Sequence, residues 1–168
     1  MARLVPGGAD AGVELPQHLL PRSGDTWSAI ERLACDLLDP VSDELGRPEL
    51  TYGFSSPALS REIPGGTAPR LDQHAGHERR RDGRLICPRG GQAVDLYVPG
   101  LSSLQLATWL LDNTPVDRLY FYGEGCPVHV SVGPDESRSA WWLRPLANGR
   151  TIPTALSAYV AGVGSSGP

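Results

Sequence analysis

An aspartate in the middle of an apolar segment is the feature that most constrains the fold of this chain. Asp95 stands in the run Ala93-Val94-Asp95-Leu96-Tyr97-Val98, which predicts a strand in the centre of a sheet. Burying an unpaired carboxylate is energetically costly. A fold that buries this strand must therefore provide Asp95 with an arginine, a set of hydrogen-bond donors or a metal ion.

Helical and strand patterns alternate along the chain. Apolar residues recur at helical spacing over residues 25–39, where we expect Pro40 to end the helix, and Ser102 begins a second helix with a capping box. Short strands are expected over residues 50–54, 93–98, 118–122, 127–132 and 140–143. This order predicts an α+β fold with a small antiparallel sheet and flanking helices.

The length of 168 residues fits a single domain. Residues 1–24 are rich in Gly and Pro and predict a flexible N-terminal arm, and residues 25–147 carry the domain. Residues 148–168 are rich in Gly, Ser and Pro again and predict a frayed C-terminal tail. Residues 63–91 read as a long polar loop, and a loop of that length is usually functional or mobile.

The composition excludes several classes of function. All 15 basic residues are arginines, so neither a Schiff-base lysine nor a lysine-containing phosphate loop can be built. The net charge of −4 argues against a nucleic-acid partner and against an acidic membrane surface. No apolar run approaches the roughly 18 residues of a membrane span, and no secretory signal is visible. We therefore expect a cytoplasmic protein without a membrane or nucleic-acid partner.

Histidines could join Asp95 in a metal site. His74 and His77 lie in the polar loop, and His129 alternates with Ser131 on one face of a predicted strand. Two imidazoles and a carboxylate form a zinc site of the catalytic type, with the fourth position open for water. The competing interpretation is that each is an ordinary polar residue, which is the commoner case for an isolated histidine.

Three segments occur in an order that is similar to a known family. Gly91–Leu96 has the pattern Gly-x-Ala-x-Asp-hydrophobic, Val128–Ser131 has an apolar residue before its histidine, and Thr51–Ser56 matches an early strand and turn. Over residues 26–134 the chain thus resembles the zinc D-Ala-D-Ala carboxypeptidase and dipeptidase family, which is also likened to the hedgehog signalling domain. The resemblance implies a metallopeptidase-like domain that binds one zinc ion, with Asp95 and His129 as ligands.

The first zinc ligand does not follow directly from the resemblance. The family has a histidine seven residues before the aspartate, where this chain has Pro88. We favour His74, because residues 72–76 resemble the Ser-x-His-x-x-Gly segment of the family. His77 and Cys87 are the alternatives.

Two residues on which peptide hydrolysis depends in that family are replaced. Cys126 stands where the family has its general-base glutamate, and Ser55 stands where it has an arginine that stabilises the oxyanion. Glu78 and Glu124 are therefore the candidates for the base. The candidates for substrate binding are Arg89, Arg118, Tyr122 and Ser131.

Together these observations predict a zinc-dependent hydrolase that cleaves an amide bond of a small peptide or a cell-wall-like substrate. One alternative is a zinc-dependent enzyme that builds or modifies a small molecule by other chemistry. Another is a metal-binding interaction domain without catalysis.

Overall fold

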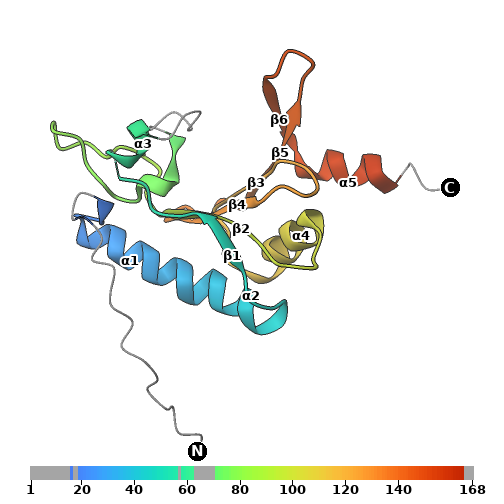
Figure 1. Ribbon diagram of the computed structural model, residues 1–168, viewed down its shortest axis with the longest axis horizontal. Coiled ribbons are helices and arrows are strands. Elements are labelled where there is room, and N and C mark those ends of the chain that lie inside the picture. Colours follow the sequence, from blue (N-terminus) through green and yellow to red (C-terminus); the bar gives the residue numbers. More distant parts are fainter. Residues whose placement is uncertain (1–15, 17–18, 57, 63–70, 165–168) are drawn as a thin grey trace, which may run out of the picture.

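The computed structural model describes residues 16, 19–56, 58–62 and 71–164, and it contains one mixed sheet (Figure 1). The sheet has six strands in the order β1-β2-β4-β3-β5-β6. They are β1 (Glu49–Tyr52), β2 (Gln92–Tyr97), β3 (Arg118–Phe121), β4 (Val128–Val132), β5 (Ser139–Pro145) and β6 (Thr151–Ala155). The α-helices are α1 (Gly24–Leu33), α2 (Asp39–Glu44), α3 (Leu59–Glu62), α4 (Ser103–Asn113) and α5 (Leu156–Gly164). A π-helix, η2 (Ala34–Leu38), and a 3-10 helix, η4 (Gln73–Ala75), complete the set.

The predicted α+β class is confirmed, but the prediction of an antiparallel sheet is wrong for one pair of strands. β3 pairs with β5 in parallel, whereas the other four neighbouring pairs are antiparallel. β2 occupies one side of β4 and β3 occupies the other, and the chain that leaves β4 passes to the far side of β3, where β5 runs parallel to β3. This crossing depends on contacts between distant segments, which local sequence patterns do not contain. The arm predicted for residues 1–24 and residues 63–70 of the predicted loop lie mostly outside the described residues.

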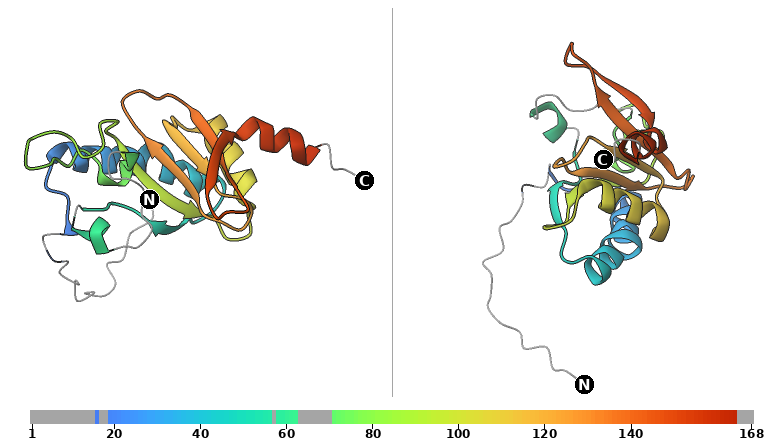
Figure 2. Two further views of the ribbon diagram at one scale, coloured as in Figure 1. Left: turned by 90° about the horizontal axis from the view of Figure 1, so that it is seen from above. Right: turned by 90° about the vertical axis from the view of Figure 1, so that its right-hand side faces the viewer.

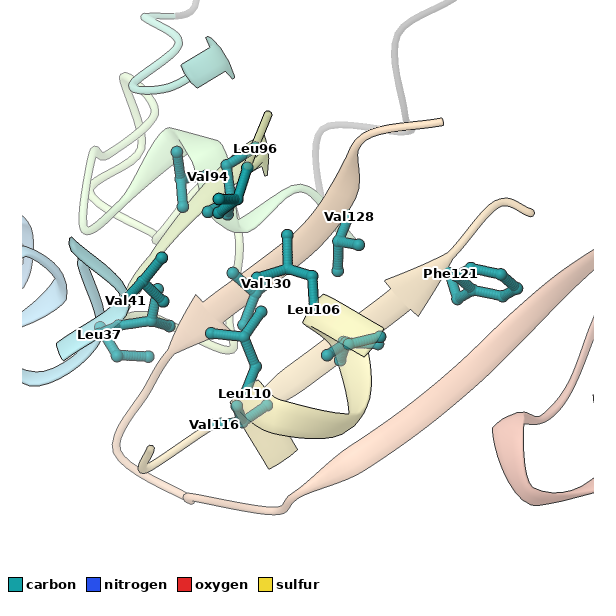
Figure 3. Close-up of a cluster of buried hydrophobic side chains, with 14 of the residues drawn as sticks. Leu37, Val41, Val94, Leu96, Leu106, Leu110, Val116, Phe121, Val128 and Val130 are labelled. Carbon is teal, nitrogen blue, oxygen red and sulfur yellow. The ribbon is translucent and has the colours of Figure 1, made fainter. Parts of the chain in front are cut away.

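One face of the sheet packs against helices to form the core. Val94, Val130 and Leu119 are in register on neighbouring strands and are buried, with exposed fractions of 1% or less. Side chains from α1, η2, α2 and α4 cover this face. Figures 1 and 2 show these helices against the sheet, and Figure 3 labels side chains of η2, α2 and α4 in the core. Because side chains alternate along a strand, the neighbours of these residues point to the opposite face.

The first helical region continues past the proline that was expected to end it. The prediction that Pro40 ends the helix is wrong, because Pro40 lies in the first turn of α2 and the chain stays helical to Glu44. The π-helical turn of η2 comes directly before it. A widened turn accommodates the missing N–H and the bulk of the proline ring, which would otherwise clash with the carbonyl four residues earlier.

The C-terminal segment is also more ordered than predicted. Residues 151–164 form β6 and α5 rather than a frayed tail, and they project from one end of the sheet (Figure 1). Tyr159 of α5 packs against Phe121 and Trp142, with ring centroids 4.8 Å apart in both pairs. The apolar side chains of α5 therefore add to the core. Within the described ranges, no helix is both long enough and apolar enough to cross a membrane.

Candidate metal centre

The sheet brings two of the predicted ligands together on the face opposite the helical core. Asp95 of β2 pairs with His129 of β4, and His129 pairs with Tyr120 of β3. On the other side, β1 places Tyr52 opposite Asp95. Paired residues of neighbouring strands share a face, so these four side chains form a row across the sheet.

The third predicted ligand, His74, comes from the loop that covers this row. His74 lies in η4, and the Asp72 side chain caps the turn by accepting a hydrogen bond of 3.0 Å from the backbone N–H of His74. The backbone N–H of Ser55 donates to the carbonyl of His74 at 2.9 Å. His74 is 4% exposed, and its ring stands at a steep angle to those of Tyr52 and His129, with centroid distances of 4.4 and 4.9 Å.

His74, Asp95 and His129 form a cluster that can hold a metal ion. The Nε2 atom of His74 lies 3.2 Å from Nδ1 of His129 and 3.2 Å from Oδ1 of Asp95. Nδ1 of His129 lies 2.8 Å from the same carboxylate oxygen. Zinc–ligand bonds of about 2.0–2.1 Å in a tetrahedron place two ligand atoms roughly 3.3 Å apart. The three observed distances are therefore near those of one face of a tetrahedral site.

Hydrogen bonding alone satisfies this cluster poorly. If both imidazole nitrogens carry a proton for Asp95, two N–H groups face each other across 3.2 Å. If only one of the two imidazole nitrogens carries a proton, Asp95 receives one hydrogen bond instead of two. A cation between the three atoms would use the lone pairs of all of them.

The pKa values in the cluster favour the forms that bind a metal. Burial alone would raise the pKa of Asp95, but its hydrogen bonds with His129 and His74 lower it well below its usual range. Burial lowers the pKa of His129, although Asp95 opposes this shift. At neutral pH the cluster therefore presents a carboxylate together with a neutral imidazole of His129, and metal ligands must be deprotonated in this way.

The two alternatives for the first ligand lie outside the cluster. Nε2 of His77 accepts a hydrogen bond of 2.9 Å from the backbone N–H of Gly91. Cys87 is fully buried, and burial raises the pKa of its thiol, which disfavours the thiolate that zinc requires. Among the described residues, only His74 joins Asp95 and His129.

Both glutamates that were considered as the base are engaged at the beginnings of helices. Oε1 of Glu78 accepts hydrogen bonds from the backbone of Arg22 and Ser23 and from the hydroxyl of Thr26, at 2.9–3.0 Å, where α1 begins. Oε2 of Glu124 accepts from the backbone N–H of Ser103 at 3.0 Å, where α4 begins. Neither belongs to the metal cluster.

The four candidates for substrate binding have different surroundings. Nη1 of Arg89 donates to the Tyr120 hydroxyl at 3.3 Å, and the Tyr120 ring lies 5.1 Å from that of His129. Tyr122 is partly exposed, at 39%, but the partial burial of its phenol, followed by the charge of Asp95, raises its pKa. Ser131 is fully buried and its hydroxyl donates to the Gln73 side chain at 2.9 Å. Nε of Arg118 lies 3.8 Å from the Asp117 carboxylate.

Four residues near the cluster were not among the site residues predicted from the sequence: Tyr52, Gln73, Asp117 and Tyr120. Asp117 carries a weaker signal than Asp95, because it follows the apolar Val116 but stands directly before β3 and not within the strand. The two tyrosines looked like ordinary residues of a sheet. Gln73 could be recognised only from contacts with distant segments.

Comparisons of the chain with protein-family models, with curated proteins and with solved structures give no match.

Proposed function

We propose that this chain is a zinc-dependent hydrolase that cleaves an amide bond in a small peptide. The observation that carries the proposal is the triangle of His74 Nε2, Asp95 Oδ1 and His129 Nδ1, with sides of 2.8–3.2 Å. Two histidines and a carboxylate are a ligand set typical of catalytic zinc, which keeps one position open for water or substrate. The resemblance of residues 26–134 to D-Ala-D-Ala carboxypeptidases supports the choice of substrate.

The chemistry of such a site suits hydrolysis. A zinc ion held there would lower the pKa of a bound water and polarise the carbonyl of the substrate. Because Glu78 and Glu124 are engaged at helix ends, the proposal relies on this acidification and not on either glutamate.

We assign Arg89 to the charged end of the substrate. Among the residues that the structure describes it forms no ion pair, and its guanidinium reaches the Tyr120 hydroxyl beside His129. Arginine binds carboxylates through two parallel hydrogen bonds. A peptide with a free carboxylate near the cleaved bond would therefore fit, and Tyr122 would line the same side.

A second candidate is a zinc enzyme that modifies a small molecule by other chemistry. The observation that favours it is that both candidate bases are engaged elsewhere. Zinc can act there as a Lewis acid without a base that activates water.

Metal analysis of the purified protein tests the first part of the proposal. We expect about one zinc per chain in the wild type and almost none in Asp95→Ala or His129→Ala, because each removes one of three ligands. His77→Ala is the matched control, since it removes a histidine outside the cluster, and it should keep its zinc. Zinc content that is unchanged in both ligand variants would overturn the site.

Turnover of small peptides tests the second part. D-Ala-D-Ala should be hydrolysed by the zinc-loaded protein, and the same peptide with an amidated C-terminus should be hydrolysed far more slowly. Arg89→Gln should abolish this preference, whereas Arg81→Gln, at an exposed site, should keep it. Full zinc occupancy with no peptide turnover would exclude the hydrolase and favour the second candidate or a binding domain without catalysis.

A further inference from the structure

The ring of His74 lacks the support that a metal-binding histidine usually has. Such a histidine normally donates its second ring N–H to a carboxylate, a carbonyl or water, which fixes the orientation of the ring. Nδ1 of His74 is buried and forms no hydrogen bond within the described part of the chain. The position of His74 must therefore be fixed through its backbone and its neighbours.

Gln73, the residue before His74, is held by a buried hydrogen-bond network. Its side-chain Nε2 donates to Oδ2 of Asp117 at 2.9 Å and to the carbonyl of Gly90 at 3.1 Å. Its Oε1 accepts from the hydroxyl of Ser131 at 2.9 Å. Gln73, Asp117 and Ser131 are each 1% exposed or less, so water cannot replace these bonds.

Asp117 is itself fixed from the other side by the loop between β4 and β5. The backbone N–H of Ser137 donates to Oδ1 of Asp117 at 3.0 Å, which leaves Oδ2 for Gln73. Gly133 makes room for the carboxylate, because a Cβ atom at that position would lie 2.6 Å from Oδ2. The network thus connects the turn that carries His74 to Asp117, directly before β3, to β4 and to the loop that follows β4.

We infer that Gln73, held by Asp117 and Ser131, is a positioning residue that keeps His74 in place for the metal. This inference rests on the proposed metal site. Ser131 and His129 lie two residues apart on β4 and so share a face of the strand. The strand that supplies one ligand therefore also anchors the turn that supplies another. The network therefore sets the distance between Nε2 of His74 and Nδ1 of His129.

The test compares the zinc affinity of Gln73→Met with that of the wild type, by competition with a chelator. Methionine keeps the length of the side chain but cannot form the three hydrogen bonds. We expect an affinity loss of about tenfold or more, as is typical for residues that support metal ligands. Thr114→Val is the matched control, because it also removes a buried hydrogen bond, from the Thr114 hydroxyl to the Leu110 carbonyl at the end of α4. It should lower the melting temperature but leave the zinc affinity within about twofold.

A rescue experiment separates positioning from general destabilisation. Gln73→Glu should bind zinc even more weakly than Gln73→Met, because it sets a second carboxylate against Asp117. Adding Asp117→Asn restores a hydrogen bond with donor and acceptor exchanged, so the double variant should recover part of the zinc affinity. The visible spectrum of the cobalt-substituted protein should shift in Gln73→Met and return toward that of the wild type in the double variant.

The outcomes distinguish this inference from the proposed function. A wild-type chain that takes up no zinc overturns the metal site and the positioning role together. A wild-type chain that binds zinc, with unchanged affinity in Gln73→Met, overturns the positioning role alone. An affinity loss in Thr114→Val as large as that in Gln73→Met would also overturn it, because destabilisation would then explain both.

Discussion

Glu78 is a buried carboxylate that caps a helix far from it in the sequence. It is 5% exposed and accepts hydrogen bonds from residues 52 to 56 positions earlier in the chain, where α1 begins. A negative charge at this end also interacts favourably with the helix dipole. The residue therefore explains why α1 begins at Gly24 although its N-cap residue, Ser23, makes no side-chain hydrogen bond.

Glu78→Gln should lower the free energy of unfolding by about 1–3 kcal/mol, because three donors lose their charged acceptor. Denaturant unfolding measures this loss, and zinc content should stay at the wild-type level. Glu31→Gln, at an exposed glutamate of α1, is the control and should change the free energy of unfolding by less than about 0.5 kcal/mol. Unchanged stability of Glu78→Gln would contradict the capping role.

The buried imidazole of His129 should make the metal-free protein sensitive to acid. Burial lowers its pKa in the folded state, whereas in the unfolded chain the pKa is about 6.5. Below about pH 6.5 the unfolded chain binds a proton that the folded chain does not, so the free energy of unfolding falls until the pH has passed the folded pKa. Urea unfolding with a chelator present, at about pH 7.5 and about pH 5.5, measures this slope.

The control for this pH dependence is His129→Gln, whose amide can still donate to Asp95 but does not titrate. Its stability should depend less on pH over the same interval. Equal slopes for the two proteins would mean that His129 does not cause the effect.

The sequence predicts the candidate metal site only in part, and the particular residues show why. Asp95 and His129 could be recognised because alternation along a strand assigns each to a face. His74 was favoured over His77 and Cys87 by resemblance, and the structure places it in the cluster. The support by Gln73 was not predictable, because it joins segments 44 and 58 residues apart.

At the scale of elements, the C-terminal segment shows the limit of composition as evidence. Its Gly and Ser content predicted a tail, yet β6 pairs along β5 and α5 buries Leu156. The decisive contacts are those of Tyr159 with Phe121 and Trp142, which come from separate strands. The strands that carry the metal cluster were predictable because alternation is local, whereas the packing of α5 is not.

Tyr159→Ala should lower the free energy of unfolding by about 2 kcal/mol or more, because it removes a ring packed between two others. Val160→Ala, at a position 47% exposed on the same helix, should cost less than about 0.5 kcal/mol. Denaturant titration of both variants provides the comparison. Equal effects would mean that α5 does not pack on the sheet as described.

At the scale of the whole molecule, the cluster joins the loop that carries η4 to two central strands. Metal binding should therefore make local opening of this loop rarer. Arg79, Arg80 and Arg81 are exposed in the same loop, and in a chain without lysine trypsin cleaves only after arginine. We expect zinc to slow tryptic cleavage at these residues several-fold in the wild type, as measured by mass spectrometry of timed digests.

Asp95→Asn is the control for this experiment, because it keeps the loop but weakens the site. Zinc should leave its rate of cleavage unchanged. The same slowing in both proteins would indicate that zinc acts on the protease or at another place.

β6 is an edge strand of the sheet, and its sequence affects whether a strand of another molecule can pair with it. Edge strands offer unpaired N–H and C=O groups to which a strand of another molecule can add, and this is a common route to aggregation. Pro153 in the middle of β6 has no N–H to offer and pairs with Leu143 on its inner side. A seventh strand could not form a continuous ladder there. The proline thus protects the molecule against growing into a fibril from this edge.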